Sequence, residues 1–346
     1  MNLPIKLALA DYRSQATCSS SAQDWETSQL IWLGWVVGLA TVAIAIELSL
    51  RIRFGLGNPL LYISDEQIGY LIAPNQNLRR FGKHIYINAY SMRSPDMTPT
   101  RPPDTLRVLL LGDSIANGGS KTDQADTISE RLRRCLGSQS ELLAAWRAHQ
   151  VEVLNASASS WSPRNQLAYV QRFGCFEAQV VVLLLNTDDL FGTAPTSIQI
   201  GRDRHYPNRK PRFALAELLD RHPFQPAILT EMQAILAEPG DRVGINLQAI
   251  QQICALVEQS GARLILAMTP LLREVTAAGS RDYEVQARQR LQDFTVQLQI
   301  PYLDFLVAFQ AVRDPAALYY DRIHLSSVGH QLVSDFLREA IEAQTP

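Results

Sequence analysis

Residues 109–119 read LLLGDSIANGG, an apolar run that ends at a glycine and is followed by an acid and a serine. This run belongs to a set of five, each rich in Val, Ile and Leu, a composition typical of parallel strands that are covered on both faces. The five strands are expected at 107–111, 151–154, 180–185, 263–268 and 301–305. Helical patterns separate them, so we predict an α/β protein, a doubly wound parallel sheet between two helix layers. We assume the strand order 2-1-3-4-5 for this sheet. Ligands of such sheets bind beyond the carboxyl ends of the strands.

Capping patterns mark where two of the intervening helices begin and end. Thr127 followed by Glu130 fits a capping box, and Gly137 fits a C-terminal cap. Ser162 and Pro163 begin the next helix, which Gly174 ends. Three further helices are expected at about 246–259, 281–299 and 326–343.

The four cysteines show no CxxC spacing, so neither a zinc site nor a redox dithiol is indicated. With the assumed strand order, the helix that carries Cys135 and the helix that ends before Cys175 cover opposite faces of the sheet. These two cysteines are therefore expected to lie too far apart for a disulfide.

The amino-terminal region predicts a single membrane-spanning helix. A polar tail, 1–29, precedes residues 30–50, LIWLGWVVGLATVAIAIELSL, in which Glu47 is the one charge. About 20 apolar residues suffice to cross the hydrocarbon core of a bilayer. The alternative is a cleaved signal sequence with Ala43-Ile44-Ala45 at its cleavage site, which the long polar tail disfavours.

The charges that flank this helix bear on its orientation in the membrane. Arg13 on one side against Arg51 and Arg53 on the other slightly favours a cytoplasmic main domain, but long domains translocate largely regardless of such charges. We expect a single-pass membrane protein with its catalytic domain outside the cytoplasm.

The rest of the chain divides into a short lead-in and one large domain. Residues 54–103 are rich in Pro, Gly and Asn, which predicts a β-containing lead-in and a stiff proline-rich linker. Residues 104–346 form the main domain, with an insertion at 193–240 at the edge of the expected active site. The net charge of −2 provides no basic field for nucleic acid, which is not an expected partner.

Two stretches at opposite ends of the main domain carry chemistry. Ser114 follows the first strand, and Asp321 and His324 lie in DRIHLS, between the fifth strand and the last helix. A serine hydroxyl needs a base to act as a nucleophile, usually a histidine held by a third group. An acid three residues before a histidine can accept from one ring nitrogen and leave the other free to take the serine proton.

Together these stretches resemble the GDSL or SGNH hydrolase family. Gly112-Asp113-Ser114 with Gly118 matches its nucleophile motif, and Asp321 to Ser326, with Gly329 and His330, matches its carboxyl-terminal motif. The resemblance covers about 107–336 and implies a flavodoxin-like fold and a serine ester hydrolase with Ser114 as nucleophile, His324 as base and acid, and Asp321 orienting it. It also implies an acyl-enzyme, no metal or other cofactor, and substrates that range from lipid esters to acetylated sugars.

The motifs of the oxyanion hole depart from this family. The resemblance assigns backbone donors to Ser114 and to Ser157, which stands where the family has glycine and needs a local φ that suits a side chain. Asp188 stands where the family has an asparagine donor, and an ionised carboxylate would repel the developing oxyanion. Three outcomes are open: a protonated Asp188, a substitute amide such as Asn186 or Asn165, or a weak site.

A basic cluster in the insertion is either a solvated loop or a contact for the substrate rim or the membrane surface. Its members are Arg202, Arg204, Arg209, Lys210 and Arg212, and Asn88 and Arg93 in the lead-in are candidates to pack against the same rim. His330 is expected to pack or to lie on the helix surface. His84, His149, His205 and His222 have no partners at metal-ligand spacing.

Three functions follow from these motifs. The main hypothesis is a membrane-anchored hydrolase of an acyl ester, carried by a glycan or a lipid. The alternatives are an O-acyltransferase that acts on a cell-surface glycan through the same acyl-enzyme, and a glycan-binding or assembly protein on a degenerate hydrolase fold.

Overall fold

The structure is a computed structural model that describes residues 8–219 and 226–345. Its centre is a parallel sheet of five strands in the order β6-β5-β7-β8-β9. The bounds are β5 (Thr105–Gly112), β6 (Gln150–Ser157), β7 (Val180–Asn186), β8 (Arg263–Thr269) and β9 (Tyr302–Asp304). This order is the assumed 2-1-3-4-5. Every residue of β5 and β7 is buried, as their continuous apolar sequence requires.

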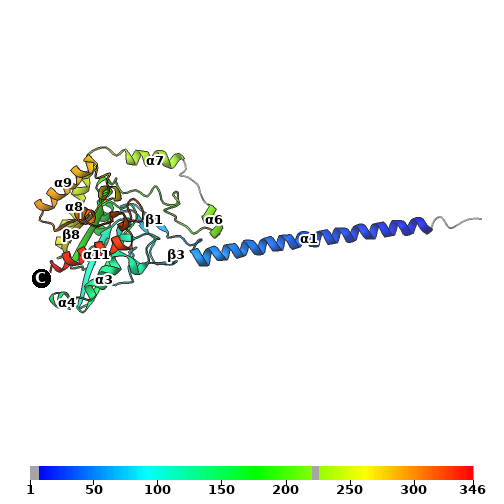
Figure 1. The fold of residues 1–346 in the computed structure, drawn as a ribbon, viewed down its shortest axis with the longest axis horizontal. Coiled ribbons are helices and arrows are strands. Elements are labelled where there is room, and N and C mark those ends of the chain that lie inside the picture. The colour runs from blue at the N-terminus through cyan, green and yellow to red at the C-terminus, as the bar shows by residue number, and fades with distance from the viewer. Residues whose placement is uncertain (1–7, 220–225, 346) are drawn as a thin grey trace, which may run out of the picture.

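Helices cover both faces of the sheet (Figure 1). Alternate residues of β5 enter different cores: Leu109 and Leu111 face one side, and Val108 and Leu110 face the other. The first side is covered by α5 (Pro163–Phe173), α8 (Arg242–Gln259) and α9 (Asp282–Gln297). The second is covered by α3 (Ile128–Gly137), α10 (Phe305–Gln310) and α11 (Ser327–Glu342). The predicted three-layer α/β/α sandwich is thereby confirmed.

Shorter helical segments connect these elements. They are α2 (Ser114–Asn117), α4 (Ser140–Ala145), α6 (Ala214–Leu219), α7 (Pro226–Leu236), η1 (Gln124–Asp126), η2 (Thr187–Phe191), η3 (Leu272–Val275) and η4 (Pro315–Leu318).

The predicted caps set the ends of α3 and α5. The Thr127 hydroxyl accepts the N–H of Glu130 at 3.3 Å, and Ser162 and Gly174 flank α5. Gly137 is the last residue of α3 rather than its cap, because Ser138 takes the cap position in a right-handed conformation. Cys135 lies on α3 and Cys175 in the core of the opposite face, and both are free, so the prediction against a disulfide is confirmed.

The lead-in contains β-structure, as predicted from its sequence. It forms two antiparallel hairpins, β1 (Tyr62–Asp65) with β2 (Gly69–Ile72) and β3 (Gln76–Arg80) with β4 (Lys83–Ile87). Their apolar residues share one core with β5 and α5. The proline-rich segment also packs on the domain, since the Pro99 carbonyl accepts from Arg107 Nη1 at 3.0 Å.

A long helix, α1 (Ala8–Phe54), projects from the domain (Figure 1). Its helical part begins within the segment expected as a polar tail. The portion Thr27–Phe54 is long and apolar enough to cross a membrane, and it includes the predicted span.

Candidate active site

Ser114 lies at the carboxyl end of β5, as the first residue of α2. The preceding Gly112 has no room for a side chain, because an added Cβ would come within 2.5 Å of the Ala116 side chain. Asp113 caps α2 by accepting the N–H of Ile115 at 2.8 Å. This tight turn fixes the Ser114 hydroxyl beyond the sheet edge, where doubly wound folds bind ligands.

The structure brings Ser114, His324 and Asp321 together from segments 210 residues apart. Ser114 Oγ lies 3.0 Å from His324 Nε2, and Asp321 Oδ2 lies 2.8 Å from His324 Nδ1. Both distances are hydrogen-bond distances, and the order of contacts is that of a nucleophile, a base and the group that orients the base.

Local backbone contacts hold Asp321 in place. Its Oδ1 accepts the N–H groups of Ile323 at 2.9 Å and of His324 at 2.8 Å. Partial burial alone would raise the pKa of Asp321, but these N–H groups and the His324 ring lower it below its usual range. Asp321 is therefore ionised at neutral pH and suited to stabilise an imidazolium on His324.

Tyr320 supports the ring of His324, a contact that no motif predicted. The two rings stack with centroids 5.6 Å apart and planes 9° from parallel. Lys121 Nζ lies 4.2 Å from the centroid of the same tyrosine ring. The aromatic pair Tyr319-Tyr320 directly before Asp321 is the only trace of this contact in the sequence.

A buried polar network lies behind Ser114. Asn186 Nδ2 donates to Asp113 Oδ2 at 2.7 Å and to Asp189 Oδ1 at 3.2 Å, and the Asn186 N–H donates to Asp189 Oδ2 at 2.9 Å. Burial raises the pKa of Asp113 and, together with the neighbouring Asp113 charge, raises that of Asp189 well above its usual range. The Ser114 hydroxyl lies 3.3 Å from Asp113 Oδ2, so this network borders the nucleophile.

Arg93 of the lead-in anchors the loop that follows the nucleophile. Its fully buried guanidinium donates to the carbonyls of Asn117, Gly119 and Thr122, each at 2.6 Å. Burial lowers the pKa of Arg93 to about 10, which leaves it charged at neutral pH. Of the two lead-in candidates, Arg93 thus contacts the active-site loop directly. Asn88 instead holds the Arg93 segment, with its Oδ1 accepting the N–H of Met92 at 3.1 Å.

A family model agrees with this geometry. The model of the GDSL-like lipase/acylhydrolase family matches residues 110–332, which is more than half of the chain. The chain belongs to the GDSL-like lipase/acylhydrolase family. The match spans both the Ser114 motif and the Asp321–His324 motif of this GDSL protein.

Solved structures give a weaker likeness. An acetylxylan esterase from Geobacillus stearothermophilus is 15% identical, with a TM-score of 0.44 over 68% of this chain and 93% of that one. A lipase/acylhydrolase from Enterococcus faecalis is also 15% identical, with a TM-score of 0.40 over 69% of this chain and 97% of that one. A search of curated proteins by sequence returns no match.

Ser157, at the glycine position of the family's second motif, lies at the end of β6. It pairs in register with Gly112, beside the nucleophile turn, and it is buried. Its φ is negative, so the side chain is accommodated without strain. Asn117 Nδ2 donates to its carbonyl at 3.2 Å, and its hydroxyl donates to Asn155 Oδ1 at 2.5 Å.

Asp188, at the asparagine position of the third motif, is solvent-exposed. Partial desolvation raises the pKa of its carboxyl, and Arg273, Arg322 and Arg281 oppose this rise. Because the side chain reaches water and has three guanidinium groups in its surroundings, we infer that it is ionised at neutral pH. This conclusion argues against a protonated Asp188 as the oxyanion donor.

The two candidate substitute amides already make other hydrogen bonds. Both N–H hydrogens of the Asn186 amide are directed at the carboxyl groups of Asp113 and Asp189. Asn165 caps α5, accepting the Ser162 N–H at 2.9 Å and donating to the Ile68 carbonyl at 2.8 Å. Asn186 therefore has no donor left for an oxyanion, because an amide nitrogen carries only two hydrogens. Asn165 is buried and held between the start of α5 and the lead-in.

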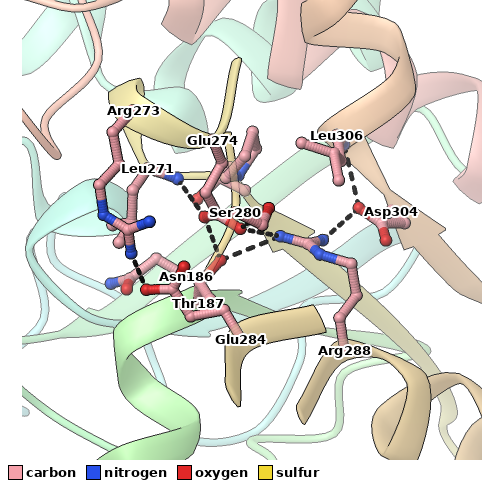
Figure 2. Close-up of polar contacts among 12 residues, drawn as sticks. Asn186, Thr187, Leu271, Arg273, Glu274, Ser280, Glu284, Arg288, Asp304 and Leu306 are labelled. Carbon is pink, nitrogen blue, oxygen red and sulfur yellow. Dashed lines mark hydrogen bonds and ion pairs between the residues drawn. The ribbon is translucent and has the colours of Figure 1, made fainter. Parts of the chain in front are cut away.

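A charged cluster under η2 fixes the backbone of the third motif (Figure 2). Thr187 Oγ1 donates to buried Glu274 at 2.6 Å and accepts from Arg288 at 3.0 Å. Arg288 also contacts Glu274 at 3.1 Å and pairs with Asp304, and Arg273 pairs with buried Glu284. Asp188 thus stands on a rigid support, although its own side chain is exposed.

The basic cluster of the insertion lies beside the carboxyl-terminal end of α1. Arg202, Arg204, Arg209 and Lys210 line a groove with Leu50 and Phe54 at the end of α1, and this groove includes none of Ser114, Asp321 and His324. The insertion leaves the sheet edge but runs across the lead-in, where the Pro207 carbonyl accepts the N–H of Tyr62 at 2.8 Å. The position beside the end of α1 agrees with the alternative of a membrane-surface contact, and the role at the substrate rim stays a prediction.

The remaining histidines lie outside the triad. His330 is buried and packs on α3's amino-terminal loop, where its Nδ1 lies 3.2 Å from the Asp126 carbonyl. Burial lowers the pKa of His330 to about 4. His84 lies 2.8 Å from Asn77, and His149 and His205 are exposed. His222 lies outside the described residues.

Proposed function

We propose that this chain is a membrane-anchored serine ester hydrolase that acts through an acyl-enzyme on Ser114. The observation that carries the proposal is the 3.0 Å contact between Ser114 Oγ and His324 Nε2, continued at 2.8 Å from His324 Nδ1 to Asp321. Membership of the acylhydrolase family supports the same reaction class.

In the proposed mechanism, Ser114 Oγ attacks the ester carbonyl while His324 Nε2 takes the hydroxyl proton. Asp321 accepts from Nδ1–H and stabilises the imidazolium. The tetrahedral intermediate collapses as His324 returns the proton to the leaving alcohol, which leaves an acyl ester on Ser114. Water then attacks this ester, with His324 as base again, and the carboxylic acid departs.

The backbone N–H groups of Ser114 and Ser157 are the proposed oxyanion donors. Asp188 contributes no donor when ionised, so the hole is held by backbone alone. A slow enzyme, or one whose substrate supplies its own donor, is the expected consequence.

The proposed substrate is an acyl ester on a glycan or a lipid, met at a membrane surface outside the cytoplasm. Anchoring by α1 supports this class, because it confines the domain to within reach of a bilayer. Such an enzyme would have no need of a metal or other cofactor, since serine, histidine and aspartate supply all proton transfers in the mechanism.

Hydrolysis of p-nitrophenyl acetate by the full chain in detergent tests this function. Ser114→Ala should lower kcat by at least about 10³-fold, as expected when a triad nucleophile is removed. Ser140→Ala, at an exposed position of α4, is the control and should retain full activity. Wild-type turnover that survives Ser114→Ala would overturn the proposal. Turnover that rises with an added sugar hydroxyl would shift it to acyl transfer.

A further inference from the structure

The last turns of α1 are fixed to α6 of the insertion. Glu47 accepts the N–H groups of Ala214 at 2.7 Å and of Leu215 at 3.0 Å, and Arg51 Nη2 donates to the Arg212 carbonyl at 2.9 Å. Figure 1 shows α6 beside the end of α1. Glu47 lies roughly 10 Å along the helix from Phe54, so α6 stands alongside the apolar span rather than beyond it.

Further contacts make this junction rigid. Glu217 of α6 accepts the Gly57 N–H at 2.6 Å and pairs with Arg80 of β3 at 2.5 Å. The Gly55 carbonyl accepts from the same arginine at 3.0 Å. The end of α1, α6 and the lead-in therefore hold one relative orientation, and a membrane crossed by α1 has to meet α6.

The outward surface of α6 is apolar. Phe213, Leu218 and Leu219 are 60%, 53% and 66% exposed, and Phe54 and Phe81 are exposed nearby. A soluble surface rarely gathers large apolar side chains in this way, whereas a segment at the boundary between headgroups and acyl chains does.

A groove of about 1600 Å³ opens between α6, the end of α1 and the insertion. One wall is apolar and includes Leu50, Phe54 and Leu218. Within the described residues, six arginine and lysine side chains line the groove against two carboxylates, Asp203 and Glu217.

Within 8–219 and 226–345, carboxylates pair with two of these six cations. Arg80 pairs with Glu217 and Arg202 with Glu231. The side chains of Arg209, Lys210 and Arg212 make no ion pair with any residue in 8–219 or 226–345. Arg204 also makes no ion pair within the same ranges and contacts only His205. Unpaired cations beside an apolar wall match a ligand with an anionic head and apolar tails.

We propose that this groove binds the headgroup of an anionic phospholipid in the leaflet at the carboxyl end of α1. The lipid phosphate lies against Arg209, Lys210 and Arg212, and the acyl chains lie along Leu50, Phe54 and α6. An acidic polysaccharide would match the charge but would leave the apolar wall and α6 uncovered. The site is separate from Ser114, so it stands whether or not the chain hydrolyses esters.

Native mass spectrometry of the full chain in detergent tests this site. Phosphatidylglycerol and phosphatidylcholine with the same acyl chains are titrated onto wild type and onto R209Q/K210Q/R212Q. The variant R134Q/R147Q/R313Q removes the same charge at exposed positions away from the groove and is the control. Thermal melts of all three proteins check the fold.

Wild type and control should bind phosphatidylglycerol about 10- to 100-fold more tightly than phosphatidylcholine, and R209Q/K210Q/R212Q should lose that preference. Equal binding of the two lipids by wild type, or a preference that survives R209Q/K210Q/R212Q, would overturn the proposal. Displacement of phosphatidylglycerol by sn-glycerol 3-phosphate at similar concentration would also overturn it, because the site would then serve a free phosphate compound.

Discussion

Replacing Asp188 with asparagine should make this protein a faster esterase. The substitution supplies a side-chain donor at the position where the family uses one, on a backbone held rigid by Thr187 and Glu274. The Asp188 carboxylate makes no hydrogen bond within the described residues, and its N–H contact with Asn186 Oδ1 at 2.7 Å involves only the backbone. Asp188→Asn should therefore leave the fold intact.

The size of the gain follows from what one donor contributes. Losing an oxyanion donor in other serine hydrolases costs roughly 2.7–4 kcal/mol. Asp188 is exposed, so a new amide there competes with water, and Arg273, Arg281 and Arg322 already offset part of the carboxylate charge. We expect about a 10- to 100-fold rise in kcat, below the full value of a buried donor.

The pH dependence makes the assay specific. Partial desolvation raises the pKa of Asp188 above its ordinary 3.8. Above that pKa the carboxylate repels an oxyanion, and below it the neutral acid can donate, so the advantage of asparagine should shrink as the pH falls.

The assay is hydrolysis of p-nitrophenyl acetate between about pH 4.5 and 8, with Asp282→Asn, an exposed substitution at the start of α9, as the control. A kcat ratio of one or less at pH 8 would contradict this prediction.

Three further predictions concern Asp321, Arg93 and His330. Asp321→Asn should lower kcat by about 10²- to 10⁴-fold with little change in KM, since the His324 ring loses the acceptor that orients it. Arg93→Met should leave three buried carbonyls unsatisfied, lowering the free energy of unfolding by roughly 2–4 kcal/mol in urea titrations, and an unchanged midpoint would contradict this. His330 has a folded pKa of about 4 against 6.5 unfolded, so the unfolded state binds the proton first as the pH falls. The free energy of unfolding should drop by about 3 kcal/mol from pH 6.5 to 4, and His330→Gln, measured in the same titrations, should remove this slope.

The main elements of the fold could be predicted because their signals are local. Continuous apolar strands such as β5 and β7 indicate a sheet covered on both faces, and the helical patterns between them indicate parallel connections. Thr127 and Ser162 cap helices through contacts with residues three positions away, which a sequence displays directly. That Ser114 and His324 lie together was predicted from the family resemblance of both motifs, because neither segment alone indicates it.

Contacts between distant segments could not be predicted. Nothing near Arg93 indicates that its guanidinium holds the loop after Ser114, because that contact depends on how the hairpins pack on the sheet. The amide of Asn186 was a candidate donor by composition, and only the positions of Asp113 and Asp189 show that it is already engaged. The position of the basic cluster beside α1 could not be predicted for the same reason, because the two segments lie some 150 residues apart in the sequence.

Labelling with a fluorophosphonate shows whether Ser114 is an activated nucleophile, because the reagent reacts covalently with a serine only when a base activates it. The full chain in detergent is treated between about pH 5 and 9, and the adduct is located by peptide mass spectrometry. We expect one adduct, on Ser114, that is absent from Ser114→Ala and strongly reduced in His324→Gln. An unlabelled Ser114 across this range, or an adduct that persists in His324→Gln at the wild-type rate, would contradict it.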